Sequence, residues 1–182
     1  MKQNQKNIFL AIILIAFVAI IRIASREFHL FNIAPIGALA LFSGAIIKDK
    51  RISLATPLIA MILGDLFFQF FTSIPGFYGA EQWFVYGAVA LVTIMGTFMG
   101  KATPVKVAGF TLGGSFLFFV ISNFGSFLSG MWGTGFKGLV TTYTMALPFY
   151  EKTIAGDLIG SLVFFGAYFL AQRATVKSAQ QA

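Results

Sequence analysis

Long apolar segments separated by short charged or Gly/Pro-rich breaks make up most of the chain. A helix of about 20 apolar residues is long enough to cross the hydrocarbon core of a bilayer. The pattern predicts six such helices, at about residues 7–24, 33–47, 52–72, 82–100, 107–128 and 153–171. The predicted fold is therefore an all-α integral membrane protein, a compact bundle of six transmembrane helices that forms one domain over residues 1–182.

The composition supports this class. Of the 182 residues, 58% are hydrophobic and only 10% are charged, and a soluble domain of this size could not bury so much apolar surface. Cysteine is absent, which excludes disulfides and thiolate metal sites. His29 is the single histidine, so multi-histidine metal motifs are excluded as well. We expect neither a metal nor a cofactor.

The distribution of positive charge predicts the orientation. With the N-terminus in the cytoplasm, nine basic residues lie inside and four (Arg22, Arg26, Lys137 and Lys152) lie outside. The positive-inside rule then places both termini in the cytoplasm of a multi-pass protein of the cell's inner (plasma) membrane. The net charge of +7 is thus explained by topology, and no nucleic-acid partner is expected. The apolar run 8–21 is long for a signal peptide, so we expect it to remain as the first span.

Two outer segments, 72–83 and 129–152, combine Gly and Pro with Trp and Tyr. The second contains so many glycines that we expect it to lie at the interface or fold back over the bundle rather than to span. Such segments serve either as an aromatic belt at headgroup level or as a lid over a binding cavity.

A short repeat links two of the predicted helices. The segments TPLIAMILGDLFF (56–68) and LPFYEKTIAGDLIGSLVFF (147–165) share a proline followed by G-D-L. With three spans in each half, the halves would form a 3+3 inverted pseudo-repeat, as in many transporters.

Polar residues recur at helical spacing on several predicted spans, as a bundle interior or an aqueous cavity requires. Most of the Ser and Thr positions are expected to form hydrogen bonds between helices. The pairs Ala40/Gly44, Gly96/Gly100, Gly109/Gly113 and Gly156/Gly160 predict close helix contacts.

Asp65, in the apolar run AMILGDLFFQF (60–70), is the most costly of these polar residues. An ionised carboxylate at membrane depth costs about 2.5–3.5 kcal/mol. One explanation is that Asp65 lines an outward-facing cavity. The other is structural, with Asp65 either capping the second helix near Asn32–Ile36 or pairing with Arg26 or Arg22. For Asp157, near the predicted start of the sixth helix, the helix dipole favours a structural role.

The chain resembles the S components of energy-coupling factor (ECF) transporters, small membrane proteins that capture vitamins and related micronutrients. The resemblance rests on the six spans, the outer loops and the segments FNIAPIGALALFSGA (31–45), PLIAMILGDL (57–66), ISNFGSFLSG (121–130) and ALPFYEKTIAGDL (146–158). These segments also look like an uncharacterised bacterial family of transport proteins. The layout is most similar to the solitary cobalamin-type group, with His29 and Tyr86 as counterparts of a loop histidine and a helix-4 tyrosine.

The chain departs from that pattern in two places. The cobalamin-type group typically offers a cysteine to cobalt, whereas this chain has Ala80, Glu81 and Gln82 in that region. Many S components dock their coupling subunit through A-x-x-x-A on the first helix, and Ala11, Ala16 and Ala19 do not have that spacing.

The leading hypothesis is a non-enzymatic membrane protein that captures a vitamin-like micronutrient from the outer side, with a corrinoid such as cobalamin as the candidate that the resemblance implies. It would lie among membrane lipids and work with an ATPase or coupling module, because the chain has no P-loop of its own. The expected substrate contacts are Asp65, Gln69, Tyr86, His29, Asn32, Asn123, Glu81, Trp83 and Asp157. The alternatives are a membrane enzyme that uses carboxylates on a lipid-like substrate and a structural assembly subunit.

Overall fold

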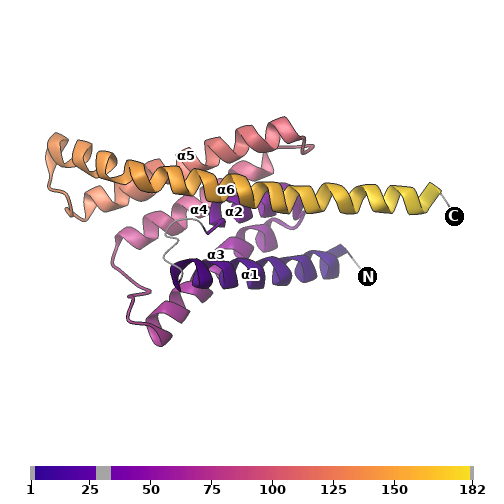
Figure 1. Ribbon diagram of the computed structural model, residues 1–182, viewed down its shortest axis with the longest axis horizontal. Helices are drawn as coiled ribbons and strands as arrows, with labels where there is room; N and C mark the ends of the chain where they lie inside the picture. The colour runs from indigo at the N-terminus through magenta and orange to yellow at the C-terminus, as the bar shows by residue number, and fades with distance from the viewer. Residues whose placement is uncertain (1–2, 28–33, 181–182) are drawn as a thin grey trace.

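The computed structural model describes residues 3–27 and 34–180, with side chains described for 5–25 and 34–174. The fold is all-helical over these ranges (Figure 1). Its helices are α1 (Gln3–Glu27), α2 (Ile36–Ile46), α3 (Lys50–Phe71), α4 (Glu81–Thr97), α5 (Pro104–Leu128) and α6 (Gly135–Gln180). The first five predicted helices match α1 to α5 within four residues at each end.

Four of the helices, α1, α3, α5 and α6, contain stretches long and apolar enough to cross a membrane. This supports membrane insertion of the chain. The other two are shorter: α4 has 17 residues and α2 has 11. At 1.5 Å per residue, α2 is about 16 Å long, roughly half the thickness of the hydrocarbon core.

The start of α6 differs from the sequence prediction. The segment 129–152 was expected to be an interfacial or folded-back loop, but α6 begins at Gly135 and continues without interruption to Gln180. The turn ends at the first residue of α6: Gly130, Gly133 and Gly135 adopt positive φ. Beyond that turn the threonine hydroxyls bond back to carbonyls one turn earlier, as in Thr141 to Lys137 and Thr144 to Val140. Their polar groups are thereby satisfied inside the helix, so an apolar environment does not disrupt it.

The short helix α2 forms the centre of the bundle. It packs against each of the other five helices, while α3, α4, α5 and α6 follow one another around it and α1 packs on α3. Its residues Ala38 to Gly44 are all buried. Figure 1 shows both chain termini at the same end of the bundle, with the C-terminal part of α6 extending beyond the other helices.

Glycines allow α2 and α4 to approach closely. A Cβ added at Gly44 would overlap the Thr93 carbonyl oxygen, and one at Gly96 would lie 2.5 Å from the Leu41 carbonyl oxygen. Close packing is therefore confirmed at Gly44 and Gly96, one member of each of two predicted pairs, whereas a Cβ at Gly100 would meet open space. The prediction for Gly109/Gly113 is wrong within this chain, because a Cβ at either position would meet open space.

Candidate functional site

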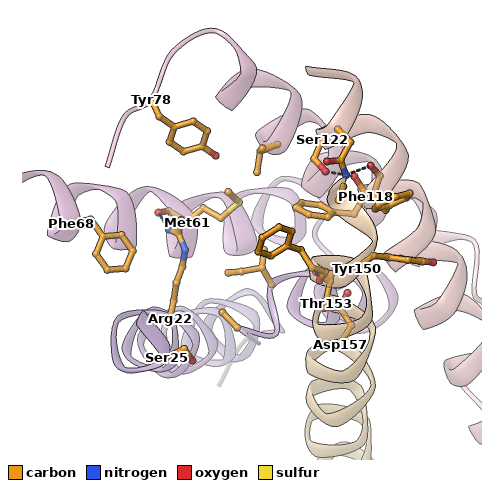
Figure 2. A pocket seen from close by; sticks show the side chains of 18 residues that line it. Arg22, Ser25, Met61, Phe68, Tyr78, Phe118, Ser122, Tyr150, Thr153 and Asp157 are labelled. Atoms are coloured by element: carbon orange, nitrogen blue, oxygen red, sulfur yellow. Dashed lines mark hydrogen bonds between the residues drawn. The ribbon is translucent and has the colours of Figure 1, made fainter. Parts of the chain in front are cut away.

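A cavity of about 480 Å³ lies among residues from all six helices and the 72–80 connection (Figure 2). The start of α2 contributes to its lining through Ile36 and Gly37. Aromatic rings supply much of the rest: Phe68, Tyr78, Phe118, Phe119, Phe149 and Tyr150. The polar side chains on its wall, besides the two tyrosines, are Arg22, Ser25, Ser122, Asn123, Thr153 and Asp157.

Arg22 connects this cavity to Asp65. Its Nη2 lies 2.6 Å from Asp65 Oδ1, and its Nη1 donates to the Met61 carbonyl oxygen at 2.7 Å. The Asp65 side chain is 2% exposed and that of Arg22 is 18% exposed. Of the alternatives left open by the sequence, the structure supports pairing of Asp65 with Arg22. Arg22 lines the cavity and Asp65 does not, so the guanidinium lies between the Asp65 carboxylate and the cavity.

The second oxygen of Asp65 binds α4. Gln82 Nε2 donates to Oδ2 at 2.9 Å, and the Tyr86 hydroxyl donates to the same atom. Both carboxylate oxygens thus accept hydrogen bonds, and the charge is paired, which are the conditions under which a buried carboxylate is tolerated. Asp65 joins α1, α3 and α4 at one point.

The same cluster holds the connection between α3 and α4. Gln69 Oε1 accepts from the backbone N–H groups of Gly76 and Phe77, at 3.1 and 3.4 Å. Gln82 accepts from Tyr78 N and donates to the Gly76 carbonyl oxygen. Gln69 and Gln82 therefore position the loop that brings Tyr78 to the cavity wall.

A glycine leaves space beside each of the two buried aspartates. A Cβ at Gly64 would lie 2.5 Å from Arg22 Nη1, so its absence lets the guanidinium cross α3 to reach Asp65. On α2, a Cβ at Gly37 would overlap the Asp157 carboxylate. The glycine of the first G-D-L thus has a steric explanation.

Asp157 caps α2. Its Oδ1 accepts from the Ala38 backbone N–H at 3.0 Å, and its Oδ2 accepts from the Ser115 hydroxyl at 2.7 Å. The sequence placed Asp157 near the start of the sixth helix, but it lies well inside α6 and serves the N-terminus of α2 instead. A carboxylate there satisfies an orphan N–H and complements the helix dipole. Capping of α2, considered at first for Asp65, is performed by Asp157.

Removal of this cap is expected to destabilise the bundle. In Asp157→Ala the buried Ala38 N–H and Ser115 hydroxyl lose their acceptor, which should cost about 1–3 kcal/mol. Asp157→Asn keeps one carbonyl oxygen and should lose less. Thermal unfolding of the detergent-solubilised protein, followed by circular dichroism, would measure both. Equal unfolding midpoints for the wild type and Asp157→Ala would contradict the capping role.

The structure separates the expected substrate contacts into groups. Asn123 and Asp157 line the cavity. Asp65 and Tyr86 form hydrogen bonds behind Arg22, and Gln69 holds the loop. Glu81 and Trp83 do not line the cavity, and Trp83 is 77% exposed. His29 and Asn32 lie outside the described residues.

The sequence reasoning missed much of the cavity wall. Arg22 was considered only as a partner for Asp65. Phe149 and Tyr150 were assigned to the loop 129–152, and Thr153, the first residue of the predicted sixth helix, was not considered as a contact. Their spacing along an apolar segment, with Asp157 one turn beyond Thr153, was the available signal for a cavity-facing helix. Among the described residues, no group of three or more His, Cys, Asp or Glu side chains could hold a metal ion.

The chain matches a protein-family model over nearly its whole length. The model described as "Family of unknown function (DUF6580)" matches residues 2–180. Neither the curated proteins nor the solved structures gave a match to this chain.

Proposed function

The chain belongs to the DUF6580 family, and from its cavity we propose that it is a membrane transport protein that binds a small, vitamin-like solute. The observation that carries the proposal is the cavity itself. Its volume of about 480 Å³ and its aromatic lining with a few polar groups are typical of small-molecule sites.

The proposal includes an orientation. The cavity is lined by the C-terminal part of α1 and by the start of α2. It therefore lies near the end of α1 that is opposite the N-terminus. Figure 1 shows the two termini together at one end, and α1 runs from there toward the other end. With cytoplasmic termini, six crossings and location in the inner membrane, the positive-inside rule directs the cavity to the outer side. The shortness of α2 supports a cavity here, because a helix that begins at mid-depth leaves space above its N-terminus.

The volume favours a solute smaller than a corrinoid. Cavities of this size enclose most of the surface of a drug-sized ligand, whereas a corrinoid macrocycle with its attached nucleotide is much larger. Capture of cobalamin would require the ligand to protrude from the bundle. An ECF-like coupling module or partner ATPase remains part of the proposal as the source of energy.

Binding is favoured over catalysis by the state of the two buried carboxylates. Asp65 is paired with Arg22, and Asp157 caps α2. A general acid or base needs a proton path to substrate, whereas the oxygens of both residues accept hydrogen bonds from the protein. The third carboxylate considered, Glu81, does not line the cavity.

A bulky side chain inside the cavity tests the proposal. Thr153→Trp replaces a wall residue whose hydroxyl, within the described part of the chain, bonds to the Phe149 carbonyl of its own helix. Ile159→Trp, at a position 60% exposed on the same helix, is the matched control. We expect native mass spectrometry of protein purified in mild detergent to show a retained small molecule in the wild type and in Ile159→Trp. The Thr153→Trp variant should lose at least about 90% of it, a tenfold effect.

Equal retention by Thr153→Trp and Ile159→Trp, with both folded, would contradict binding in this cavity. Absence of any small molecule, together with a protein subunit that co-purifies in fixed ratio, would favour the assembly-subunit alternative. Turnover of an added lipid by the purified protein would favour the enzyme.

A further inference from the structure

The polar groups of the cavity differ in kind between its two sides. Figure 2 shows Arg22 near Met61 and Phe68 on one side, and Ser122 and Thr153 with Phe118 and Tyr150 on the other. Each group can be classified by the hydrogen bonds that it already makes to the protein and by the donors and acceptors that remain for a ligand.

On the α1 side the cavity offers donors. A guanidinium has five N–H donors and no acceptor, and those that Arg22 gives to Met61 and Asp65 leave others for a ligand. Its side chain is 18% exposed, although it lies 5.5 Å from the centre of the Phe68 ring. A carbonyl oxygen of a bound solute could therefore reach it.

On the α5 and α6 side the cavity offers mainly acceptors. The Ser122 hydroxyl donates to the Phe118 carbonyl at 2.7 Å, and the Thr153 hydroxyl donates to that of Phe149 at 3.0 Å. Asn123 Nδ2 donates to the Phe119 carbonyl at 2.8 Å. A hydroxyl that has donated its proton keeps lone pairs, and the Asn123 amide keeps its oxygen and one N–H. An O–H or N–H of a solute would be accepted here.

The α5 and α6 side also presents aromatic rings to the cavity. Phe118 and Phe119 line the cavity, and the Phe119 and Tyr150 rings lie 4.4 Å apart at 30° to each other. Such faces favour flat, aromatic ligands in offset-stacked or edge-on contact.

The charges near the cavity are already balanced. The positive charge of Arg22 is paired with Asp65 at 2.6 Å. Asp157 is 2% exposed and faces the partly positive N-terminus of α2. An anionic ligand would therefore bring a second negative charge to an arginine that Asp65 already neutralises. A cationic ligand would find no exposed carboxylate among the described residues that line the cavity.

From this arrangement we infer that the cavity selects a neutral, planar aromatic solute with a carbonyl acceptor at one end and an O–H or N–H donor at the opposite end. The carbonyl binds Arg22, and the donor binds Ser122 and Asn123. The inference rests on the proposed function, since it names the class of solute that the same cavity takes.

Three naphthalene probes test the inference. The compound 6-hydroxy-2-naphthamide has both groups at opposite ends, 2-naphthamide lacks the donor, and 6-hydroxy-2-naphthoate replaces the neutral amide by an anion. Binding would be measured by isothermal titration calorimetry with the full chain in nanodiscs. We expect 6-hydroxy-2-naphthamide to bind about tenfold more tightly than either of the others. Relative to 2-naphthamide it makes one more hydrogen bond, and relative to the naphthoate it adds no negative charge beside the Arg22–Asp65 pair.

A variant connects the preference to the acceptor side. In Ser122→Ala/Asn123→Leu the affinity for 6-hydroxy-2-naphthamide should fall to that for 2-naphthamide, while the affinity for 2-naphthamide stays unchanged. Among the described residues, both side chains donate only to carbonyls of their own helix, so the fold should tolerate the changes. A thermal unfolding midpoint near that of the wild type would verify this.

The outcomes separate the two levels of proposal. Tightest binding of the naphthoate, or equal affinities for the two amides, would overturn the inferred solute class and leave the proposed function intact. A donor preference that persists in the double variant would overturn the assignment of Ser122 and Asn123. If no probe binds and the purified protein retains no small molecule, the proposed function fails and the inference fails with it.

Discussion

Asp65→Leu is expected to lower the free energy of unfolding by about 3–5 kcal/mol, because removal of one partner of a buried ion pair leaves the other uncompensated. In this variant the Arg22 guanidinium loses the oxygen 2.6 Å from Nη2. Gln82 and Tyr86 lose their shared acceptor as well. Unfolding of the purified protein in mixed micelles by added sodium dodecyl sulfate, followed by circular dichroism, would measure the loss.

The double variant Arg22→Met/Asp65→Leu is the control. Replacing both partners of a buried pair by apolar side chains of similar size is often neutral, so the double variant should recover much of the lost stability. The opposite result is equally informative. Suppose instead that Asp65→Leu unfolds like the wild type but no longer retains a solute. The carboxylate then contacts the ligand and does not hold α1, α3 and α4 together, and the structural role assigned to it is wrong.

Gly44→Ala is the second substitution with a large expected effect. Its Cβ would overlap the Thr93 carbonyl oxygen and lie about 3.1 Å from the Gly96 Cα. Both are backbone atoms, so α2 and α4 would have to separate. Overpacking of this kind costs about 1–3 kcal/mol, and α2 is the helix on which all the others pack. The thermal unfolding midpoint should therefore fall clearly below that of the wild type.

Gly113→Ala provides a matched control. It makes the same chemical change within a helix, but its Cβ meets nothing within 4 Å. Since alanine is the better helix former by about 1 kcal/mol, Gly113→Ala should unfold no earlier than the wild type. Similar midpoints for Gly44→Ala and Gly113→Ala would mean that the α2–α4 contact does not limit stability.

The sequence predicted most of the helices well because each carries its own signal. Apolar length and the breaks between segments give α1 to α5 within four residues. The start of α6 was missed because glycine content suggested a loop across 129–152, whereas the glycines that break the helix end at Gly135. Glycine beyond that point, as at Gly138, is compatible with a helix that neighbours and internal hydrogen bonds support.

The candidate site was less predictable. The cost of a buried carboxylate identified Asp65 and Asp157 as important from sequence alone, and both are almost completely buried. Their roles could not be assigned, because the partners are distant in the chain: Arg22 is 43 residues from Asp65, and Ala38 is 119 residues from Asp157. Helical periodicity places a residue on a face but does not say which helix that face meets.

The sequence by itself determined that this is a helical protein with membrane-spanning character, because hydropathy and segment length are local properties that any packing must respect. It also singled out the two aspartates, because the cost of burying a charge is set by the surrounding residues of the same segment. Only the tertiary structure decided that Asp65 pairs with Arg22, that Asp157 caps α2, and that Arg22, Asn123 and Thr153 share a cavity. These contacts join different helices. Which helices meet depends on close packing at positions such as Gly44 and Gly96. Such packing is a property of the assembled bundle and cannot be read from any one segment.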